Sequence, residues 1–169
     1  MADIAVTRVE PARRGVLGVI LRILRWIGAW LVAAVSTTVL GSVLQTQRVV
    51  GELNAVDGGI GLGERVSATF YDLNHFAVHY GAFILVGTLV AFLAGSLVYR
   101  LAGFGRPVVF AVAGAVAMAV MLTLMKEAFF GVQIVAGARF ALGFALQIVA
   151  GGLGGLVFAW LSSRGRAAR

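Results

Sequence analysis

Long apolar stretches are the main feature of the chain, and they set the pattern from which its structure can be predicted. Four of them contain no Asp, Glu, Lys, Arg or Pro in their interior: residues 26–44, 76–98, 108–125 and 140–161. At about 1.5 Å per residue, a helix over each stretch can cross a hydrocarbon core of about 30 Å. The pattern therefore predicts an all-α integral membrane fold, with one domain built as a four-transmembrane-helix bundle.

The segments around these stretches predict how the bundle meets the membrane surface. Residues 1–25 form a basic cytoplasmic or interfacial segment, in which Pro11 should break any early helix. Arg22 and Arg25 are three residues apart and share a helical face, so we expect them to contact lipid headgroups. A docking site for a partner or a specific lipid is the alternative for this pair. A cleaved signal peptide is disfavoured, because the apolar stretch continues to Leu44 without a stop.

The first outer connection, residues 45–75, is expected to form a loop that caps the bundle. Its middle contains VDGGIGLGE, which is typical of a turn. Residues 48–56 before this turn are compatible with a short helix. After the turn, Val66, Phe70 and Leu73 fall at helical spacing, which predicts a short helix at the membrane interface. The apolar connection 126–139 should lie at the membrane interface or pack beneath this loop, with an ion pair between Glu127 and Arg139.

Lys and Arg are distributed unequally between the two sides that four spans would create. Ten of them fall on one side and four on the other. The richer side carries Arg8, Arg13, Arg14, Arg22, Arg25, Arg100, Arg106, Arg164, Arg166 and Arg169. Because the cytoplasmic side takes the excess, both termini are predicted to lie in the cytoplasm (N-in/C-in).

Composition agrees with a membrane location and excludes several chemistries. Hydrophobic residues make up 60% of the 169 residues and charged residues only 12%, against a usual charged share of about 25%. The net charge of +7 sits around the apolar stretches and not in a basic run interleaved with aromatic residues, so we expect no nucleic-acid partner. The chain has no cysteine, which excludes disulfides and thiolate sites.

Small residues recur at four-residue spacing, a pattern that lets helices approach closely in lipid. The stripes that we expect to form helix-packing or partner interfaces are Gly87, Ala91 and Gly95, followed by Gly151, Gly154 and Gly155. Thr38, Ser42 and Gln147 are the polar residues expected inside the membrane. Hydrogen bonding between helices is the main interpretation of these three, and a solute pathway is the alternative.

One group of residues resembles the ligand set of a metal or cofactor site. Asp72, His75 and His79 fall at positions i, i+3 and i+7 of an expected helix, so they share one face. A carboxylate and two imidazoles suit zinc, copper or iron. These are the only two histidines of the chain, and we therefore expect interfacial hydrogen bonding first, with a metal, haem or quinone site as the alternative.

The function expected from the sequence is non-catalytic: a small inner-membrane subunit or assembly factor of a larger membrane complex. Membrane lipids and other membrane subunits, or further copies of the chain, are the expected partners, and no cofactor is required. A redox-associated protein and a homo-oligomeric transporter of small solutes or lipids are the alternatives. Usage rich in Ala, Gly and Arg with one Lys is typical of GC-rich bacterial genomes, which favours the inner membrane of a bacterium.

Overall fold

The fold is a bundle of four long α-helices, seen here in a computed structural model that describes residues 9–57, 59–103 and 105–163. The helices are α1 (Val9–Asp57), α2 (Leu62–Ala102), α3 (Arg106–Ala128) and α4 (Ala141–Ser163), and a short 3-10 helix, η1 (Ala136–Ala138), precedes α4. All four α-helices are long and apolar enough to cross a membrane. The prediction of four such helices is confirmed, and the described residues contain no strand. Arg8, Arg164, Arg166 and Arg169, which contribute to the charge asymmetry, lie outside the described residues.

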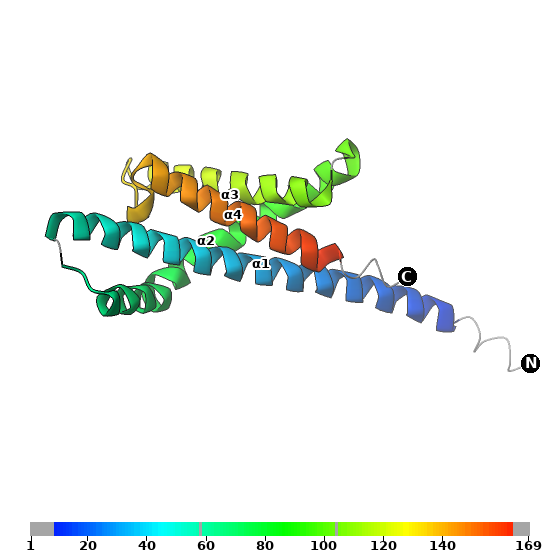
Figure 1. Ribbon diagram of the computed structural model, residues 1–169. Helices are drawn as coiled ribbons and strands as arrows, with labels where there is room; N and C mark the ends of the chain where they lie inside the picture. The colour runs from blue at the N-terminus through cyan, green and yellow to red at the C-terminus, as the bar shows by residue number, and fades with distance from the viewer. Residues whose placement is uncertain (1–8, 58, 104, 164–169) are drawn as a thin grey trace, which may run out of the picture.

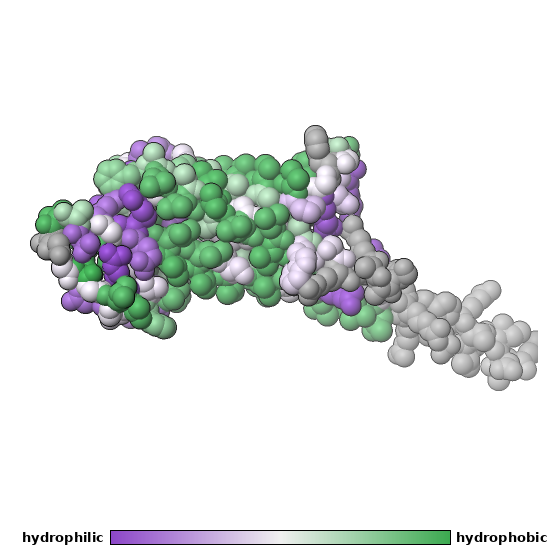
Figure 2. Space-filling model, viewed as in Figure 1, coloured by the Kyte–Doolittle hydropathy of each residue, from purple (hydrophilic) through white to green (hydrophobic). Residues whose placement is uncertain are grey.

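The helices run alternately in opposite directions, so each end of the bundle gathers parts of all four (Figure 1). We call one end the arginine end, defined by Arg22 and Arg25 of α1, Arg100 of α2 and Arg106 of α3. The opposite end, where the turn between α1 and α2 and η1 are found, is called the hairpin end. Figure 2 shows an apolar band around the middle of the bundle with hydrophilic residues gathered towards both ends.

α1 and α2 are much longer than the expected spans, and this corrects the prediction of an interfacial loop cap over residues 45–75. α1 continues to Asp57 and α2 begins at Leu62, so the expected loop is a helical hairpin with its turn in the predicted glycine-rich segment. The helices can continue because residues 12–106 contain no proline. Residues 45–57 and 62–75 are therefore helical continuations of the two spans and not a separate loop.

Two further details of the helix ends differ from or refine the prediction. α1 begins at Val9, and Pro11 lies in its first turn, where the missing N–H has no helical partner to lose; the expected break at Pro11 was wrong. At the arginine end, α2 stops at Gly103, whose φ of 66° is left-handed and favours glycine. Pro107 lies in the first turn of α3. This short connection places α2 and α3 side by side, as predicted.

The connection between α3 and α4 packs against α1. Val135 and Ala138 are buried, and Gly137 lies against the backbone of Gln45 in α1. The apolar run is therefore partly a core element, as expected from its composition. The ion pair expected between Glu127 and Arg139 does not form, although both side chains line the same cavity.

Two buried clusters hold the bundle together. Near the arginine end, the ring of Phe92 stacks on that of Phe158, with centroids 4.5 Å apart, and Phe110 meets both rings edge to face at 4.7–5.9 Å. Trp26 also meets Phe158 edge to face at 5.5 Å. The second cluster contains Tyr80, Ile84, Met118 and Leu122, together with Val135. The aromatic cluster lies beneath the arginine end.

Candidate functional sites

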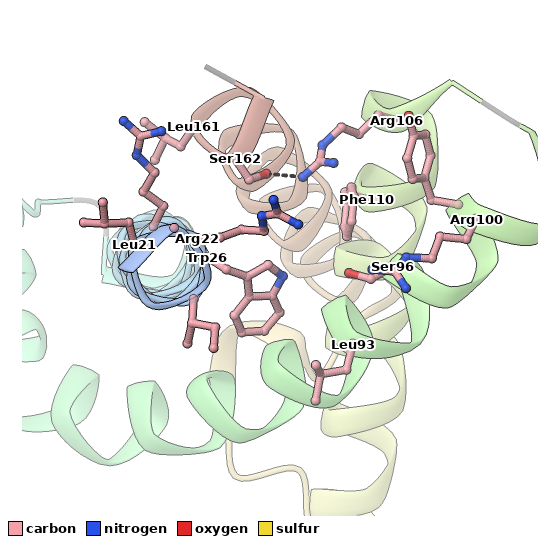
Figure 3. Close-up of a pocket in the computed structure, with 14 residues that line it drawn as sticks. Leu21, Arg22, Trp26, Leu93, Ser96, Arg100, Arg106, Phe110, Leu161 and Ser162 are labelled. Atoms are coloured by element: carbon pink, nitrogen blue, oxygen red, sulfur yellow. Dashed lines mark hydrogen bonds between the residues drawn. The ribbon is translucent and has the colours of Figure 1, made fainter. Parts of the chain in front are cut away.

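A cavity of about 770 Å³ opens at the arginine end, with walls from all four long helices (Figure 3). Four of its lining residues are arginines, and none of the described lining residues is acidic. We call this space the arginine cavity. Figure 3 shows the guanidinium groups of Arg22, Arg100 and Arg106 pointing towards the space between the helices, and Arg25 also contributes to the lining.

Arg106 is the arginine with the most defined surroundings. Its Nη2 donates a hydrogen bond of 2.6 Å to Oγ of Ser162 in α4. Its guanidinium carbon lies 5.6 Å from the ring centre of Tyr99 and 5.1 Å from that of Phe110, distances typical of cation–π contacts. Contacts to α2, α3 and α4 therefore hold this guanidinium group in place.

The rest of the lining is largely apolar. Leu93 comes from α2, Phe110 from α3 and Leu161 from α4, while Trp26 of α1 joins the cavity to the aromatic cluster below it. The cavity thus combines cationic groups with apolar walls. This combination suits an amphipathic anion better than a fully hydrated one.

Of the three polar residues expected inside the membrane, Gln147 hydrogen-bonds other helices, whereas within the described part of the chain Thr38 and Ser42 do not. Gln147 of α4 is 1% exposed; its Oε1 accepts a hydrogen bond from the Tyr80 hydroxyl of α2 (2.8 Å), and its Nε2 donates to the carbonyl of Gly41 in α1 (2.9 Å). Thr38 donates to Ala34 of its own helix and lies against Gly81 of α2. Ser42 is buried, and its hydroxyl has no hydrogen-bond partner among the described residues, so the hydrogen bond expected between helices does not form there. Gln147 therefore connects α4 to α1 and α2, as expected of a residue that bonds between helices. Its partners Tyr80 and Gly41 were not identified from the sequence.

The small-residue stripes face neighbouring helices of the same chain. A methyl group added at Gly154 would overlap the Thr37 hydroxyl of α1, and one at Gly155 would overlap the Phe110 carbonyl of α3. Gly151 faces Gly114 and Met118, Gly95 faces Ala113 and Phe110, and Gly87 is near Met121; Ala91 is half-buried. The close approaches of these glycines therefore occur within one chain.

Asp72, His75 and His79 do not gather around a common point. Asp72 Oδ2 accepts a hydrogen bond of 2.7 Å from the Thr46 hydroxyl of α1. His75 is exposed, stacks on Tyr71 with centroids 4.3 Å apart, and places Nδ1 3.1 Å from the Tyr71 carbonyl oxygen. His79 makes the equivalent contact with the His75 carbonyl oxygen at 3.2 Å. Among the described residues, no three His, Cys, Asp or Glu side chains form a group that could hold a metal ion.

The hairpin of α1 and α2 carries an exposed apolar stripe on α2. Leu62, Val66 and Phe70 are four residues apart, and they are 83%, 55% and 63% exposed. We call these three residues the hairpin stripe. Leu53 and Val56 of α1 are also exposed near the turn.

The sequence predicted lipid contacts for Arg22 and Arg25, but it did not group Arg100 and Arg106 with them. The predicted topology contained the information needed to group them, because four antiparallel spans place all four arginines at the same end of the bundle. The interpretation of the arginine cavity and the hairpin stripe has to rest on their geometry. Comparison of the chain with known protein families, curated proteins and solved structures finds no match in any of the three.

Proposed function

We propose that the protein is a small non-catalytic membrane subunit that attaches to a larger membrane complex through the hairpin of α1 and α2. The observation that carries this proposal is the hairpin stripe, an apolar surface on a helical segment that extends past the expected span. Leu62, Val66 and Phe70 belong to the part of α2 that precedes the apolar stretch 76–98.

The lengths of the helices support a projecting hairpin. α2 has 41 residues, which corresponds to about 60 Å of helix, whereas a hydrocarbon core of about 30 Å needs about 20 residues. α3 and α4 have 23 residues each, close to one bilayer crossing. If all four helices span, about half of α2 lies outside the hydrocarbon, and its first turns carry the stripe.

The hairpin is built as a unit that can present the stripe. Besides the bond from Thr46 to Asp72, the amide of Gln47 donates to the Thr69 hydroxyl across the two helices (3.3 Å). At the turn, Asn54 Oδ1 accepts from the Ile60 N–H, at 3.1 Å. Contacts between helices and across the turn therefore order the hairpin before any partner binds, which lowers the entropic cost of association.

Charge favours a protein partner over a lipid surface at this position. Between residues 45 and 75 the chain has two arginines and four carboxylates, a net charge of −2 with neutral histidines. Anionic headgroups would be repelled by such a segment, whereas a protein surface can offer apolar contacts and matched charges. We therefore assign the stripe to the extramembrane part of a membrane protein partner.

The test is site-specific photo-crosslinking in the native membrane. A photoreactive residue at Val66 or Phe70 should give an adduct with one and the same membrane protein, whereas Val90, which is exposed on the span of the same helix, should give none. Phe70→Asp should then release the partner on native gels, while Asn74→Asp, which adds the same charge nearby, should retain it. Adducts with a second copy of the chain, or equal yields from Val90, would contradict the proposal.

A further inference from the structure

We propose that the arginine cavity binds the phosphate-bearing headgroup of an anionic phospholipid. This inference does not depend on the proposed partner of the hairpin, which lies at the other end of the bundle. It also goes beyond lipid contacts of Arg22 and Arg25 on one helix face, because it assigns a site formed by four helices.

The positive charge of the cavity favours an anionic ligand. Arg22, Arg25, Arg100 and Arg106 line one space, and none of the described lining residues carries a compensating negative charge. Several like charges around one space repel one another, and an anion placed between them is attracted by each. Guanidinium groups also match phosphate oxygens in geometry, because each can donate two parallel hydrogen bonds to them. A bound phosphate therefore relieves the repulsion and uses the donors.

The apolar part of the lining favours a ligand that is amphiphilic. Trp26, Leu93, Phe110 and Leu161 contribute apolar surface next to the arginines. The volume of about 770 Å³ lies within the range of about 300–1,000 Å³ typical of small-molecule sites, so it can accept a headgroup with its glycerol backbone. The large apolar residues of α1 next to the cavity, Leu21, Ile23 and Leu24, are also exposed, and acyl chains would cover them.

One donor of the site is fixed in advance. The hydrogen bond from Arg106 to Ser162 and its contacts with the Tyr99 and Phe110 rings restrict the guanidinium group before a ligand arrives. Arg22 and Arg100 are exposed side chains on two other helices. The site therefore combines one cation held by its neighbours with exposed ones that can reach a headgroup phosphate.

The expected orientation places the arginine cavity in the leaflet that contains anionic phospholipids. The arginine end is the side predicted to face the cytoplasm, and the cytoplasmic leaflet carries anionic headgroups that attract basic groups. The rim arginines would then lie at headgroup depth, where phosphate is abundant.

Native mass spectrometry of the full-length protein tests the inference. The protein is released from micelles that contain equal amounts of phosphatidylglycerol and phosphatidylethanolamine. The wild type should retain phosphatidylglycerol at least fivefold more than phosphatidylethanolamine. Arg22→Gln combined with Arg100→Gln should lower the retained phosphatidylglycerol at least fivefold. Arg48→Gln combined with Arg65→Gln, the same loss of charge at the hairpin end, should change it by less than twofold.

Two further measurements separate the site from a general loss of fold and from a soluble ligand. Arg22→Lys with Arg100→Lys keeps the charge and the helices but loses the paired donors, and it should still lower retention about threefold. Glycerol phosphate at millimolar concentration should not displace the lipid. Equal retention of both lipids by the wild type, equal loss in both glutamine variants, or displacement by glycerol phosphate would overturn the inference, the last because it would assign a soluble phosphate ester to the cavity.

Discussion

Gly155 lies where α4 crosses α3 so closely that an added methyl group would overlap the Phe110 carbonyl. Gly152, three residues earlier in the same helix, has its nearest neighbour at 3.6 Å from a built Cβ, an ordinary contact. Two glycines of one helix therefore have different reasons to be present. One permits a close approach of two backbones, and the other could be replaced.

This difference predicts opposite effects of one substitution. Gly155→Ala should lower the free energy of unfolding by about 2 kcal/mol, because α3 and α4 must move apart. Gly152→Ala should leave it unchanged or raise it by up to about 1 kcal/mol, since alanine is the better helix former. Unfolding in mixed micelles with increasing sodium dodecyl sulfate measures both. Equal losses at the two positions would show that the helices do not cross as described.

Gln147 provides a second prediction at the residue scale. Gln147→Leu removes two hydrogen bonds and leaves the buried Tyr80 hydroxyl without its acceptor, so it should cost about 1 kcal/mol in the same assay, within the range found for bonds between helices in membranes. Tyr80→Phe should cost less, because Gln147 keeps its bond to Gly41. The double variant should lose less than the two single losses added together, as expected for residues in contact. Strict additivity would argue against the contact.

The residue types at these contacts could be predicted from the sequence, but their partners could not. Four-residue spacing of small residues indicates close packing, and a lone amide in an apolar stretch indicates a hydrogen bond between helices. Neither pattern tells which helix faces which. Tyr80 and Gly41 are neighbours of Gln147 because α1, α2 and α4 pack together at this level of the bundle. The sequence of a single helix does not determine how it packs against the others.

At the scale of the element, hydropathy identified the four helices but not the ends of the first two. Residues 45–57 and 62–75 are more polar than the spans, and hydropathy therefore separates them from the helices that they continue. The local signals for continuity are weaker: the lack of proline, and the pair of Arg48 with Glu52 one turn later, at 2.7 Å. The glycine-rich turn was placed correctly because glycine and aspartate are strong turn signals on their own.

Gly51 distinguishes a helix from a loop in this region. In the structure it lies inside α1, with nothing within 4 Å of a built Cβ. Gly51→Ala should therefore raise the free energy of unfolding by up to about 1 kcal/mol, whereas Gly51→Pro should lower it by about 3 kcal/mol. The same unfolding assay, with helix content followed by circular dichroism, compares the two. A proline that is tolerated as well as alanine would contradict a continuous α1 through this position.

At the scale of the whole molecule, the two ends of the bundle have opposite character. The arginine end gathers cations from three helices around one cavity, and the hairpin end presents apolar residues on a segment with net negative charge. Both proposals assume four membrane crossings, and the lipid proposal also takes the arginine end to face the cytoplasm. The distribution of Lys and Arg predicts that orientation, and the fold adds that the charges at one end meet in a single site.

This arrangement can be tested directly by cysteine labelling. The chain contains no cysteine, so a single introduced cysteine is the only thiol that can react. Val56, at the tip of the hairpin, and Leu101, near the turn between α2 and α3, are 86% and 78% exposed. Val56→Cys should react with a membrane-impermeant maleimide in intact bacterial spheroplasts, and Leu101→Cys should react only after lysis. The reverse pattern, or labelling of both positions from one side, would contradict the account.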